Sequence, residues 1–464
     1  MICDFVDRWG ALHGLQTFLQ LVACSAEPSG LAVAGAPWAI ADAPRFPHRG
    51  LLLDTSRHFL PVPALLRSLD AMAASKLNVL HWHIVDAQSF PFGSEAVPSL
   101  PTHGAYPSRR GRLTYSLKDV AAVAAHAEAR GIRVLPEFDA PGHAYAWGGL
   151  NSGPHAPSAL TVCAAAEPWA TYCAEPPCGQ LDATHEGVYT MLAKLLPEAA
   201  RAFMPPSVRA AGAPARDIWF HAGGDEVNNA CYLDTPHVKA WMAAHNASSP
   251  ADGVTKLLQY FHDRERQVLS RVAGTVIQWE GTWTAGVVLD PGTTVIQAWL
   301  PGSLARAAAA GFRVINSEAA TYYLDCGFGG WIGPGQSWCP PYKSWYDIWS
   351  VDPAANLTNA DTRGRLLGGE AALWGEMTDD SNLDNKAWPR AAAAAERFWS
   401  PPLEGWAKGG GPGSEAAGDA LTRLVAHRAR LVARHGVRAA PLQPTYCTLG
   451  GGNVNCPWTT GPTN

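Results

Sequence analysis

The sequence contains little charge. Lysine, arginine, aspartate and glutamate make up 16% of its 464 residues, against roughly 25% in an average globular protein. The formal net charge is −5, which excludes a nucleic-acid partner held by an excess of basic residues. Hydrophobic residues make up 47%, too many for a disordered chain. No apolar run reaches the ~18 residues that cross a bilayer, so we expect no membrane span.

Two further features are missing. None of the 10 cysteines forms a Cys-x-x-Cys pair, which disfavours a structural zinc site. The N-terminus, Met1-Ile-Cys-Asp, is not a basic segment followed by an apolar core, so no signal peptide is visible. Several cysteines nevertheless lie in loops rich in proline, glycine and tryptophan, where disulfides would restrain the chain. With the glycosylation sequons at Asn246 and Asn356, they favour a secretory compartment.

Tryptophan, by contrast, is abundant, with 19 residues, many of them beside glycine, proline or acidic residues. A flat, polarisable indole can stack on the C–H face of a sugar ring, so carbohydrate binding is one explanation. Packing in the core is the other. Both remain open for the four tryptophans of one loop, Trp331, Trp338, Trp345 and Trp349.

Eight short apolar runs alternate with helical segments between residues 50 and 400. The alternation predicts a parallel sheet, and eight such units that close on themselves form a (β/α)8 TIM barrel. An open doubly wound sheet is the competing α/β fold, but it usually has a glycine-rich turn after its first strand, and Asp54-Thr-Ser-Arg-His has none. The predicted strands are residues 51–53, 78–85, 133–138, 218–221, 275–279, 294–299, 313–316 and 367–374.

Helical segments follow most of these strands. Ser116 and Asp119 have the spacing of a capping box at the start of one of them, and Gly131 ends the same segment. The predicted helices are residues 64–76, 116–130, 187–203, 255–272, 386–398 and 416–435.

Polar and aromatic residues follow the predicted strands. In a barrel the active site lies at the carboxyl ends of the strands. Carboxylates there could handle protons, while arginine and aromatic rings could hold sugar rings and hydroxyls, so the pattern suits sugar chemistry. The residues are Asp54, Arg57, His58, Asp86, Glu137, Asp139, His143, Asp225, Glu226, Trp279, Glu280, Trp299, Tyr322, Tyr323, Asp325, Trp374 and Glu376.

The sharpest local feature is His221-Ala-Gly-Gly-Asp-Glu226. Its glycines allow a tight turn directly after a strand. Asp225 and Glu226 are adjacent, so their side chains point to different sides of the chain. They are therefore poorly placed to form an opposed pair of acid and nucleophile ~5–5.5 Å apart across the scissile bond. One carboxyl could instead protonate the leaving oxygen while the other orients a nucleophile of the substrate, as in substrate-assisted hydrolysis of 2-acetamido sugars. A helix cap or a solvated turn is the alternative interpretation.

Five longer motifs carry a resemblance to a known family. They are residues 47–61, 76–86, 136–143, 221–226 and 369–376. In sequence order they resemble glycoside hydrolase family 20, the β-N-acetylhexosaminidases, and most closely the eukaryotic lysosomal and vacuolar members. The resemblance implies a (β/α)8 barrel and a retaining exo-β-N-acetylhexosaminidase acting on terminal, non-reducing β-linked GlcNAc or GalNAc.

The same resemblance implies catalytic roles. Glu226 would be the general acid/base, which protonates the glycosidic oxygen and then activates water. Asp225 would accept a hydrogen bond from the acetamido N–H and stabilise the charge of an oxazolinium-like intermediate. The nucleophile would be the acetamido carbonyl oxygen, and no cofactor is implied.

A substrate-binding set is implied as well. Arg57 and Glu376 would bind ring hydroxyls, for which a planar guanidinium is well suited. Tyr323 would donate to the acetamido carbonyl, with Asp325 as a secondary contact. The others would form an indole box, Trp279, Trp299 and Trp374, and a network beside the acid pair, Asp86 and His143.

Two further hypotheses compete with this one. His81 and His83 share one strand face and could bind a metal, as in a metal-dependent barrel hydrolase. The other ligands of such an enzyme are not evident at later strand ends, so a hydrogen-bonded barrel interior explains the pair better and no metal is expected. A catalytically impaired sugar-binding homologue is the last hypothesis, against which the intact Asp225, Glu226 and Arg57 argue.

The chain departs from the family pattern in two places. Ala87 stands where a second aspartate usually follows Asp86. In addition, only 48 residues precede Arg49, where family members carry a whole α/β domain, so an incomplete gene model or a genuine short form is expected. The expected division is a remnant of that domain at 1–48, the barrel at 49–440 and a tail at 441–464.

The family also implies a disulfide between Cys163 and Cys231. Plausible local pairs are Cys326 with Cys339, Cys173 with Cys178, and Cys447 with Cys456 in the tail, while Cys3 and Cys24 are left unassigned. The expected partner is an oligosaccharide or glycoconjugate that ends in N-acetylhexosamine. A homodimer and a lysosomal, vacuolar or secreted location are expected from the same resemblance.

Overall fold

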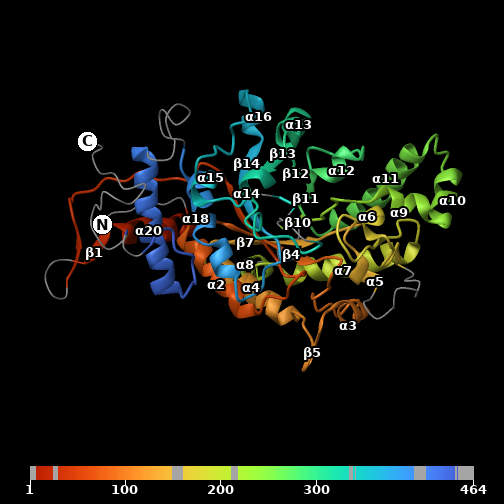
Figure 1. Cartoon of the computed structure of the whole chain (residues 1–464), viewed down its shortest axis with the longest axis horizontal. Helices are drawn as coiled ribbons and strands as arrows, with labels where there is room; N and C mark the ends of the chain where they lie inside the picture. Colours follow the sequence, from red (N-terminus) through yellow and green to blue (C-terminus); the bar gives the residue numbers. More distant parts are fainter. Residues whose placement is uncertain are drawn as a thin grey trace.

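The centre of the computed structural model is a closed barrel of eight parallel strands (Figure 1). The structure describes residues 7–24, 30–148, 160–210, 218–333, 338–339, 341–401, 414–444 and 447. In order around the barrel the strands are β3 (His48–Asp54), β4 (Val79–Val85), β7 (Arg133–Phe138), β10 (Trp219–His221), β11 (Thr275–Trp279), β12 (Thr294–Ala298), β13 (Arg313–Asn316) and β14 (Leu366–Leu373). The barrel prediction is confirmed, and pairing of β14 with β3 excludes the open sheet.

Along each barrel strand every second side chain points into the barrel, as the pleat of a strand requires. Val79, Leu135, Ile277, Val295 and Ile315 form a buried apolar cluster. Residues two positions further along four of these strands are also buried, but most of them are polar: His81, Glu137, Trp279 and Gln297. The barrel is therefore filled with apolar side chains in one layer and with hydrogen-bonding side chains in the next, toward the carboxyl ends of the strands.

The larger helices cover the barrel from outside. They are α2 (Val62–Ala74), α4 (Leu117–Glu128), α7 (Glu186–Ala202), α11 (Pro250–Leu269), α13 (Ser303–Ala309), α18 (Arg390–Trp399) and α20 (Glu415–His435). Ser116 and Asp119 form the predicted capping box before α4. The predicted helix 386–398 is wrong in one respect, because the chain breaks at Pro389 into α17 (Leu383–Ala387) and α18. Proline has no N–H to continue the helix.

Short elements fill the connections between strands and helices. They are α3 (Ser99–Gly104), β5 (Pro107–Ser108), β6 (Gly111–Arg112), α5 (Tyr145–Gly148), β8 (Thr161–Val162), α6 (Trp169–Tyr172), β9 (Gln180–Leu181), α8 (Pro206–Ala210), α9 (Asn229–Asp234), α10 (Pro236–Ala244), α12 (Glu280–Thr284), α14 (Ala319–Tyr322), α15 (Trp345–Trp349) and α16 (Ala360–Gly364). Most of the loops at the carboxyl ends of the strands contain such short elements.

The N-terminal segment consists of α1 (Arg8–Leu21) and a hairpin of β1 (Val22–Cys24) and β2 (Leu31–Val33). It joins the barrel through polar contacts: Arg8 pairs with Glu128, and Lys76 hydrogen-bonds to Thr17. No residue of α1 is fully buried, so this segment contributes little to the core. In the described part of the chain no helix is long and apolar enough to cross a membrane.

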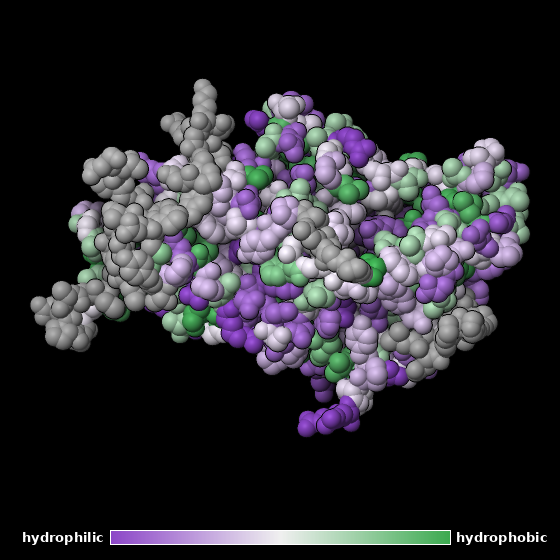
Figure 2. Space-filling model, in the orientation of Figure 1, coloured by the Kyte–Doolittle hydropathy of each residue, from purple (hydrophilic) through white to green (hydrophobic). Residues whose placement is uncertain are grey.

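The visible surface mixes polar and apolar residues, with small green areas set among purple ones (Figure 2). Most large apolar side chains are inside; those that remain exposed include Leu31, Trp38, Val288 and Trp338. Trp338 is set apart from the others, because it lies at the mouth of the cavity described below.

The capping box gives a test of this architecture. Ser116→Ala removes the hydroxyl that accepts the Asp119 N–H and should lower the free energy of unfolding by about 1 kcal/mol. Urea denaturation measures the change. Lys118→Ala, on an exposed position of the same helical turn, should change it by less than about 0.5 kcal/mol. Equal effects of the two substitutions would contradict the cap.

Candidate active site

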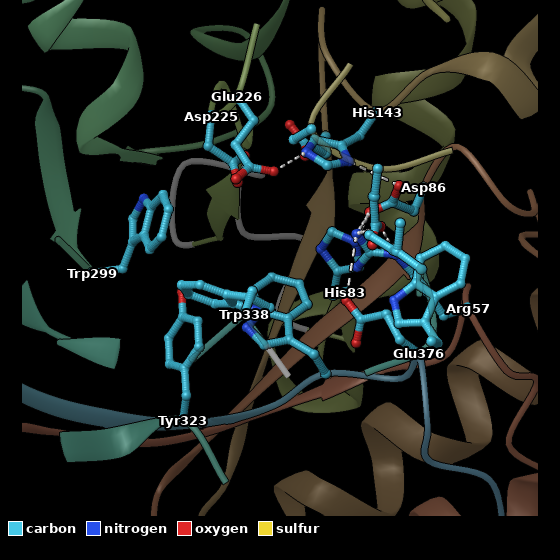
Figure 3. A pocket seen from close by; sticks show the side chains of 16 residues that line it. Arg57, His83, Asp86, His143, Asp225, Glu226, Trp299, Tyr323, Trp338 and Glu376 are labelled. Carbon is cyan, nitrogen blue, oxygen red and sulfur yellow. Dashed lines mark hydrogen bonds and ion pairs between the residues drawn. The ribbon is translucent and has the colours of Figure 1, made fainter. Parts of the chain in front are cut away.

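A cavity of about 200 Å³ opens at the carboxyl ends of the strands. Sixteen residues line it, among them every substrate-binding or catalytic residue predicted from the sequence except Trp279 and Asp325 (Figure 3). The lining residues are Arg57, His83, Asp86, Asp139, His143, Ala174, Glu175, Asp225, Glu226, Trp299, Tyr323, Trp331, Ile332, Trp338, Trp374 and Glu376. The barrel thus brings together residues from most of its strand ends.

The turn after β10 carries the two adjacent carboxyls. Gly223 and Gly224 have φ of +62° and +91°, in the region that glycine adopts without strain. A Cβ on Gly223 would lie 1.8 Å from Asp139 Oδ1, and one on Gly224 would lie 2.0 Å from Thr282 Oγ1. Gly224 N–H donates to Asp139 Oδ1 at 2.8 Å. No other residue type fits this turn, which directs Asp225 and Glu226 into the cavity.

Asp225 and Glu226 lie in unlike surroundings. Asp225 is 9% exposed, and its Oδ1 has no hydrogen-bond partner among the described residues. Burial, followed by the charge of Asp139, raises the pKa of Asp225 well above its usual value. The Glu226 side chain is 35% exposed and lies 3.2 Å from His143 Nε2. Burial acts to raise the pKa of Glu226, but the hydrogen bond and charge of His143 outweigh it and leave it lowered.

His143 connects Glu226 to a buried network. Its Nδ1 lies 3.0 Å from Asp86 Oδ1, and Asp86 Oδ2 lies 2.8 Å from His83 Nε2. Burial acts to lower the pKa of His143, yet the charge of Asp86 and the hydrogen bonds to both carboxylates raise it well above its usual value. These contacts favour the protonated form of His143, in which each ring nitrogen can donate to a carboxylate.

Arg57 occupies the opposite end of the cavity and is surrounded by carboxylates. Its guanidinium lies 3.0 Å from Asp54, 2.9 Å from Asp86, 2.5 Å from Glu175 and 4.0 Å from Glu376. Its side chain is only 6% exposed. Moving the guanidinium away from these carboxyls would therefore leave an unpaired charge in a buried place. Burial raises the pKa of Glu376 well above its usual value, against the opposing charge of Arg57.

Two polar contacts of Arg57 were not found from the sequence. Gln88 Oε1 accepts from Arg57 Nε at 2.9 Å, and Gln88 Nε2 donates to Glu175 at 3.0 Å. Glu175 lies in a small loop closed by the Cys173–Cys178 disulfide. The sequence signal for Glu175 was its position between two cysteines that can pair, because a loop closed by a disulfide holds its side chains in a fixed direction.

An aromatic wall faces Glu226 across the cavity. Trp299 and Tyr323 are stacked, with ring centroids 6.3 Å apart and an interplanar angle of 13°. Trp338 meets both edge-on at 5.8 Å and is 62% exposed. Trp299 Nε1 is buried and has no partner among the described residues. The wall thus presents an apolar face to the cavity.

The loop tryptophans divide between the two explanations left open above. Trp331 and Trp338 line the cavity, while Trp345 and Trp349 lie in α15 and are 9% and 2% exposed. The first pair is therefore available to a ligand, and the second belongs to the core.

Trp279 and Asp325 lie behind the cavity wall. Trp279 is fully buried, donates from Nε1 to Glu137 at 2.8 Å and lies 6.0 Å from the Trp374 ring. Asp325 Oδ1 lies 3.5 Å from the Trp374 backbone nitrogen. Burial raises the pKa of Asp325 to about 6. Both residues contact Trp374 from behind, and neither of them lines the cavity.

His81 and His83 face carboxylates on both sides of each ring. His81 Nδ1 lies 2.6 Å from Glu370 and Nε2 lies 3.0 Å from Glu137. His83 lies 2.5 Å from Glu137 and 2.8 Å from Asp86. His81, Glu137 and His221 are close enough to hold a metal ion. His81 Nδ1 is hydrogen-bonded to Glu370, and both histidines next to Glu137 on β4 lie within ion-pair distance of it, so a polar barrel interior remains the preferred interpretation of these residues.

Three disulfides have both cysteines within the described residues: Cys163–Cys231, Cys173–Cys178 and Cys326–Cys339. The first ties the segment after β7 to α9, beside the turn that carries Glu226. Cys456 and Cys3 lie outside the described residues, so the expected pair of Cys447 and Cys456 stays a prediction. Asn246 and Asn356 are both exposed, as glycosylation would require.

Comparison with known proteins gives a consistent result. The family model described as "Glycosyl hydrolase family 20, catalytic domain" matches residues 46–402. The chitooligosaccharidolytic beta-N-acetylglucosaminidase of Bombyx mori is 36% identical over 449 residues, which cover 95% of this chain and 69% of that protein. The beta-hexosaminidase subunit beta of Felis catus is 36% identical over 443 residues, which cover 95% of this chain and 73% of that protein.

Solved structures agree. The family 20 exo beta-N-acetylglucosaminidase of Vibrio harveyi, in complex with N-acetylglucosamine, matches with a TM-score of 0.71 at 26% identity, covering 93% of this chain and 64% of that chain. The chitobiase of Flavobacterium johnsoniae matches with a TM-score of 0.67 at 26% identity, covering 92% of this chain and 57% of that chain. This chain therefore spans less than two thirds of the length of these two bacterial proteins.

Gly223 provides a test of the turn. Gly223→Ala should lower the free energy of unfolding by at least about 2 kcal/mol, because the new methyl group overlaps Asp139 and the left-handed φ is strained. Gly302→Ala is a matched control: its φ is +76° but no atom lies within 4 Å of the new Cβ, so it should cost only about 1 kcal/mol. Denaturant unfolding measures both, and equal costs would show that the overlap is relieved.

Proposed function

Because this chain belongs to glycosyl hydrolase family 20, we propose that it is a retaining exo-β-N-acetylhexosaminidase that removes terminal, non-reducing β-linked GlcNAc or GalNAc. The observation that carries the proposal is the pair Asp225 and Glu226 at one end of a cavity whose other end is closed by Arg57 and Glu376. A cavity of about 200 Å³ between these two pairs suits one terminal sugar. Relatives named for action on such sugars support the same conclusion.

In the first step the substrate supplies the nucleophile. The acetamido N–H donates to Asp225, whose buried Oδ1 is a free acceptor, and the acetamido carbonyl oxygen attacks C1. The bond from C1 to the glycosidic oxygen breaks as Glu226 gives that oxygen its proton. The product is an oxazolinium ion, whose positive charge the Asp225 carboxylate stabilises at close range.

In the second step water attacks C1 from the face that the leaving group vacated. Glu226, now a carboxylate, takes the proton of this water, the bond from C1 to the acetamido oxygen breaks, and the acetamide is restored. Two displacements at C1 give net retention of configuration. One carboxyl thus acts as acid and then as base, and no second carboxylate nucleophile is needed.

The proposed roles require the protons of the two carboxyls to be redistributed when the sugar binds. Without a bound sugar, burial favours the neutral form of Asp225, while His143 favours the ionised form of Glu226. An acetamido N–H on Asp225 stabilises its ionised form, and the bound sugar shields Glu226 from water. Substrate binding therefore lowers the proton affinity of Asp225 and raises that of Glu226. Glu226 then holds the proton that the leaving oxygen needs.

The remaining contacts position the sugar. Arg57 and Glu376 suit the ring hydroxyls, and the Trp374 and Trp299 rings suit its apolar face. Burial raises the pKa of Tyr323 well above its usual value, so its hydroxyl stays a donor for the acetamido carbonyl. Trp279 and Asp325 act through Trp374, which both contact, and Asp86 acts through His143.

Location and assembly follow as further parts of the proposal. Three disulfides and two exposed sequons support a lysosomal, vacuolar or secreted protein. The exposed side chains of Phe328, Ile332 and Tyr342 support a homodimer through the loop between β13 and β14. The division into 1–48, 49–440 and 441–464 is part of the same proposal; the first barrel strand, β3, begins at His48, next to the first boundary. Light scattering of the purified chain would test the dimer.

Glu226→Gln tests the reaction. It removes the proton that the leaving oxygen needs and should lower kcat/KM for 4-nitrophenyl GlcNAc β-glycoside by at least about 100-fold. Binding of a thiazoline mimic of the intermediate should persist, because Asp225 and Arg57 are unchanged. Glu186→Gln, at an exposed salt bridge away from the cavity, is the control and should leave the rate unchanged.

Steady-state kinetics with paired GlcNAc and GalNAc substrates, in excess EDTA, measures these effects. Full activity of Glu226→Gln would overturn the proposed mechanism. Sugar binding without turnover by the folded wild-type chain would favour the impaired homologue, and loss of activity in EDTA would favour a metal-dependent hydrolase.

Trp338→Ala tests the aglycone side of the cavity. The exposed indole at the mouth can stack on the sugar that follows the scissile bond, so its loss should raise KM for β-linked GlcNAc oligosaccharides by roughly 5–10-fold, about 1 kcal/mol of stacking energy. KM for the 4-nitrophenyl monosaccharide should change less than the value for the oligosaccharide. Trp38→Ala, at a similarly exposed indole outside the cavity, should change neither value.

A further inference from the structure

A row of histidines and carboxylates runs through the barrel from the start of β3 to the catalytic acid. It begins at buried His48 and ends at Glu226, with a carboxylate between each histidine and the next. The links are His48 to Glu370 at 2.8 Å, Glu370 to His81 at 2.6 Å, His81 to Glu137 at 3.0 Å, Glu137 to His83 at 2.5 Å, His83 to Asp86 at 2.8 Å, Asp86 to His143 at 3.0 Å and His143 to Glu226 at 3.2 Å.

Glu137 is the branch point of this row. It is fully buried on β7 and faces His81 and His83 from β4. Its Oε1 accepts the Trp279 indole N–H at 2.8 Å and lies 3.0 Å from His221 Nδ1. A buried carboxylate is tolerated only when it is paired and hydrogen-bonded. Glu137 is hydrogen-bonded to His83 and Trp279, so these two side chains are fixed against it, with His81 and His221 packed beside them.

One branch leads to Glu226. Glu137 orients the His83 ring, His83 and Arg57 hold Asp86, and Asp86 holds His143 against Glu226. Every member before Glu226 has a side chain at most 8% exposed. A displacement of His83 would therefore pass through Asp86 to His143, because water is not present in bulk to replace a lost partner.

The other branch leads to Asp225. Trp279 donates its indole N–H to Glu137 and its backbone N–H to Gly223 O at 3.0 Å. His221 Nδ1 accepts the Gly223 N–H at 3.1 Å. Gly223 begins the turn that carries Asp225, so the position of that carboxyl depends on residues that surround Glu137.

We propose that Glu137 is the positioning residue for both catalytic carboxyls: it holds His83, and through it the acid Glu226, and it holds Trp279, and through it the turn of Asp225. This inference rests on the proposed function. Glu137 does not line the cavity and touches no substrate. Its effect is on the chemical step, because a displaced acid transfers its proton less efficiently while the sugar contacts of Arg57 remain.

Glu137→Gln is the central variant, since the amide keeps the shape of the side chain but loses the charge and one acceptor. We expect kcat to fall by about 100-fold with KM within about threefold of the wild type. The loss should be larger for substrates with poor leaving groups, such as a GlcNAc disaccharide, than for 2,4-dinitrophenyl GlcNAc β-glycoside, whose leaving group needs little protonation. Glu137→Asp, which restores the charge, should recover part of the loss.

Glu265→Gln is the matched control. Glu265 is a buried carboxylate 3.1 Å from His262, a second buried pair of the same kind that does not belong to the row. Its loss should lower stability without changing the ratio of rates between the two substrates. Titration of active sites with the thiazoline mimic corrects each rate for the folded fraction.

The leaving-group ratio separates the possible outcomes. A positioning role is supported if the ratio changes in Glu137→Gln and not in Glu265→Gln. It is overturned if all substrates lose the same factor, or if the loss matches the loss of titratable sites. Should Glu137→Gln not fold, His83→Gln cuts the same branch, and an unchanged ratio there overturns the inference. Inactivity of the wild type would instead reject the proposed function.

Discussion

The pairing of buried charge inside a closed barrel is the constraint on which the rest of this structure depends. His81, His83 and Glu137 are at most 1% exposed, and an ion without water or a partner is unstable by several kcal/mol. Each of these histidines lies between two carboxylates. None of the rings can rotate without leaving a charge unpaired, so the interior is rigid for electrostatic as well as steric reasons.

That rigidity is useful because the catalytic carboxyls are neighbours in sequence. Adjacent residues on a turn would ordinarily share one environment and titrate alike. Here the glycine turn buries Asp225 and leaves Glu226 partly exposed beside His143. The two carboxyls therefore differ in proton affinity: burial raises the pKa of Asp225, while the hydrogen bond and charge of His143 outweigh burial and lower the pKa of Glu226. Arg57, at the far end, lies within 4.0 Å of four carboxyl groups.

Much of this could be predicted from the sequence, because the relevant signals are local. All eight strands lie within three residues of their predicted ends, since buried strands between helices read as short apolar runs. The capping box before α4 is equally local. The helix break at Pro389 was missed because the alanines after it favour a helix strongly, and one continuous helix was predicted across the proline. Glu175 and Gln88 were missed as site residues, and Trp338 could not be assigned to the cavity or to the core, because their loops have no periodicity that fixes the direction of a side chain.

The sequence by itself determined the barrel, the order of its strands and the chemical types of the residues at their ends, since these follow from hydrophobic periodicity and short motifs. Only the tertiary structure decided which side chains face the cavity. Trp279 ends β11 and Asp325 lies in the loop after β13, on the same side of the barrel as the cavity residues, yet both lie behind Trp374. The stagger of strands in a closed barrel decides which layer a side chain joins. Strand stagger depends on contacts between residues far apart in the chain, which no local pattern records.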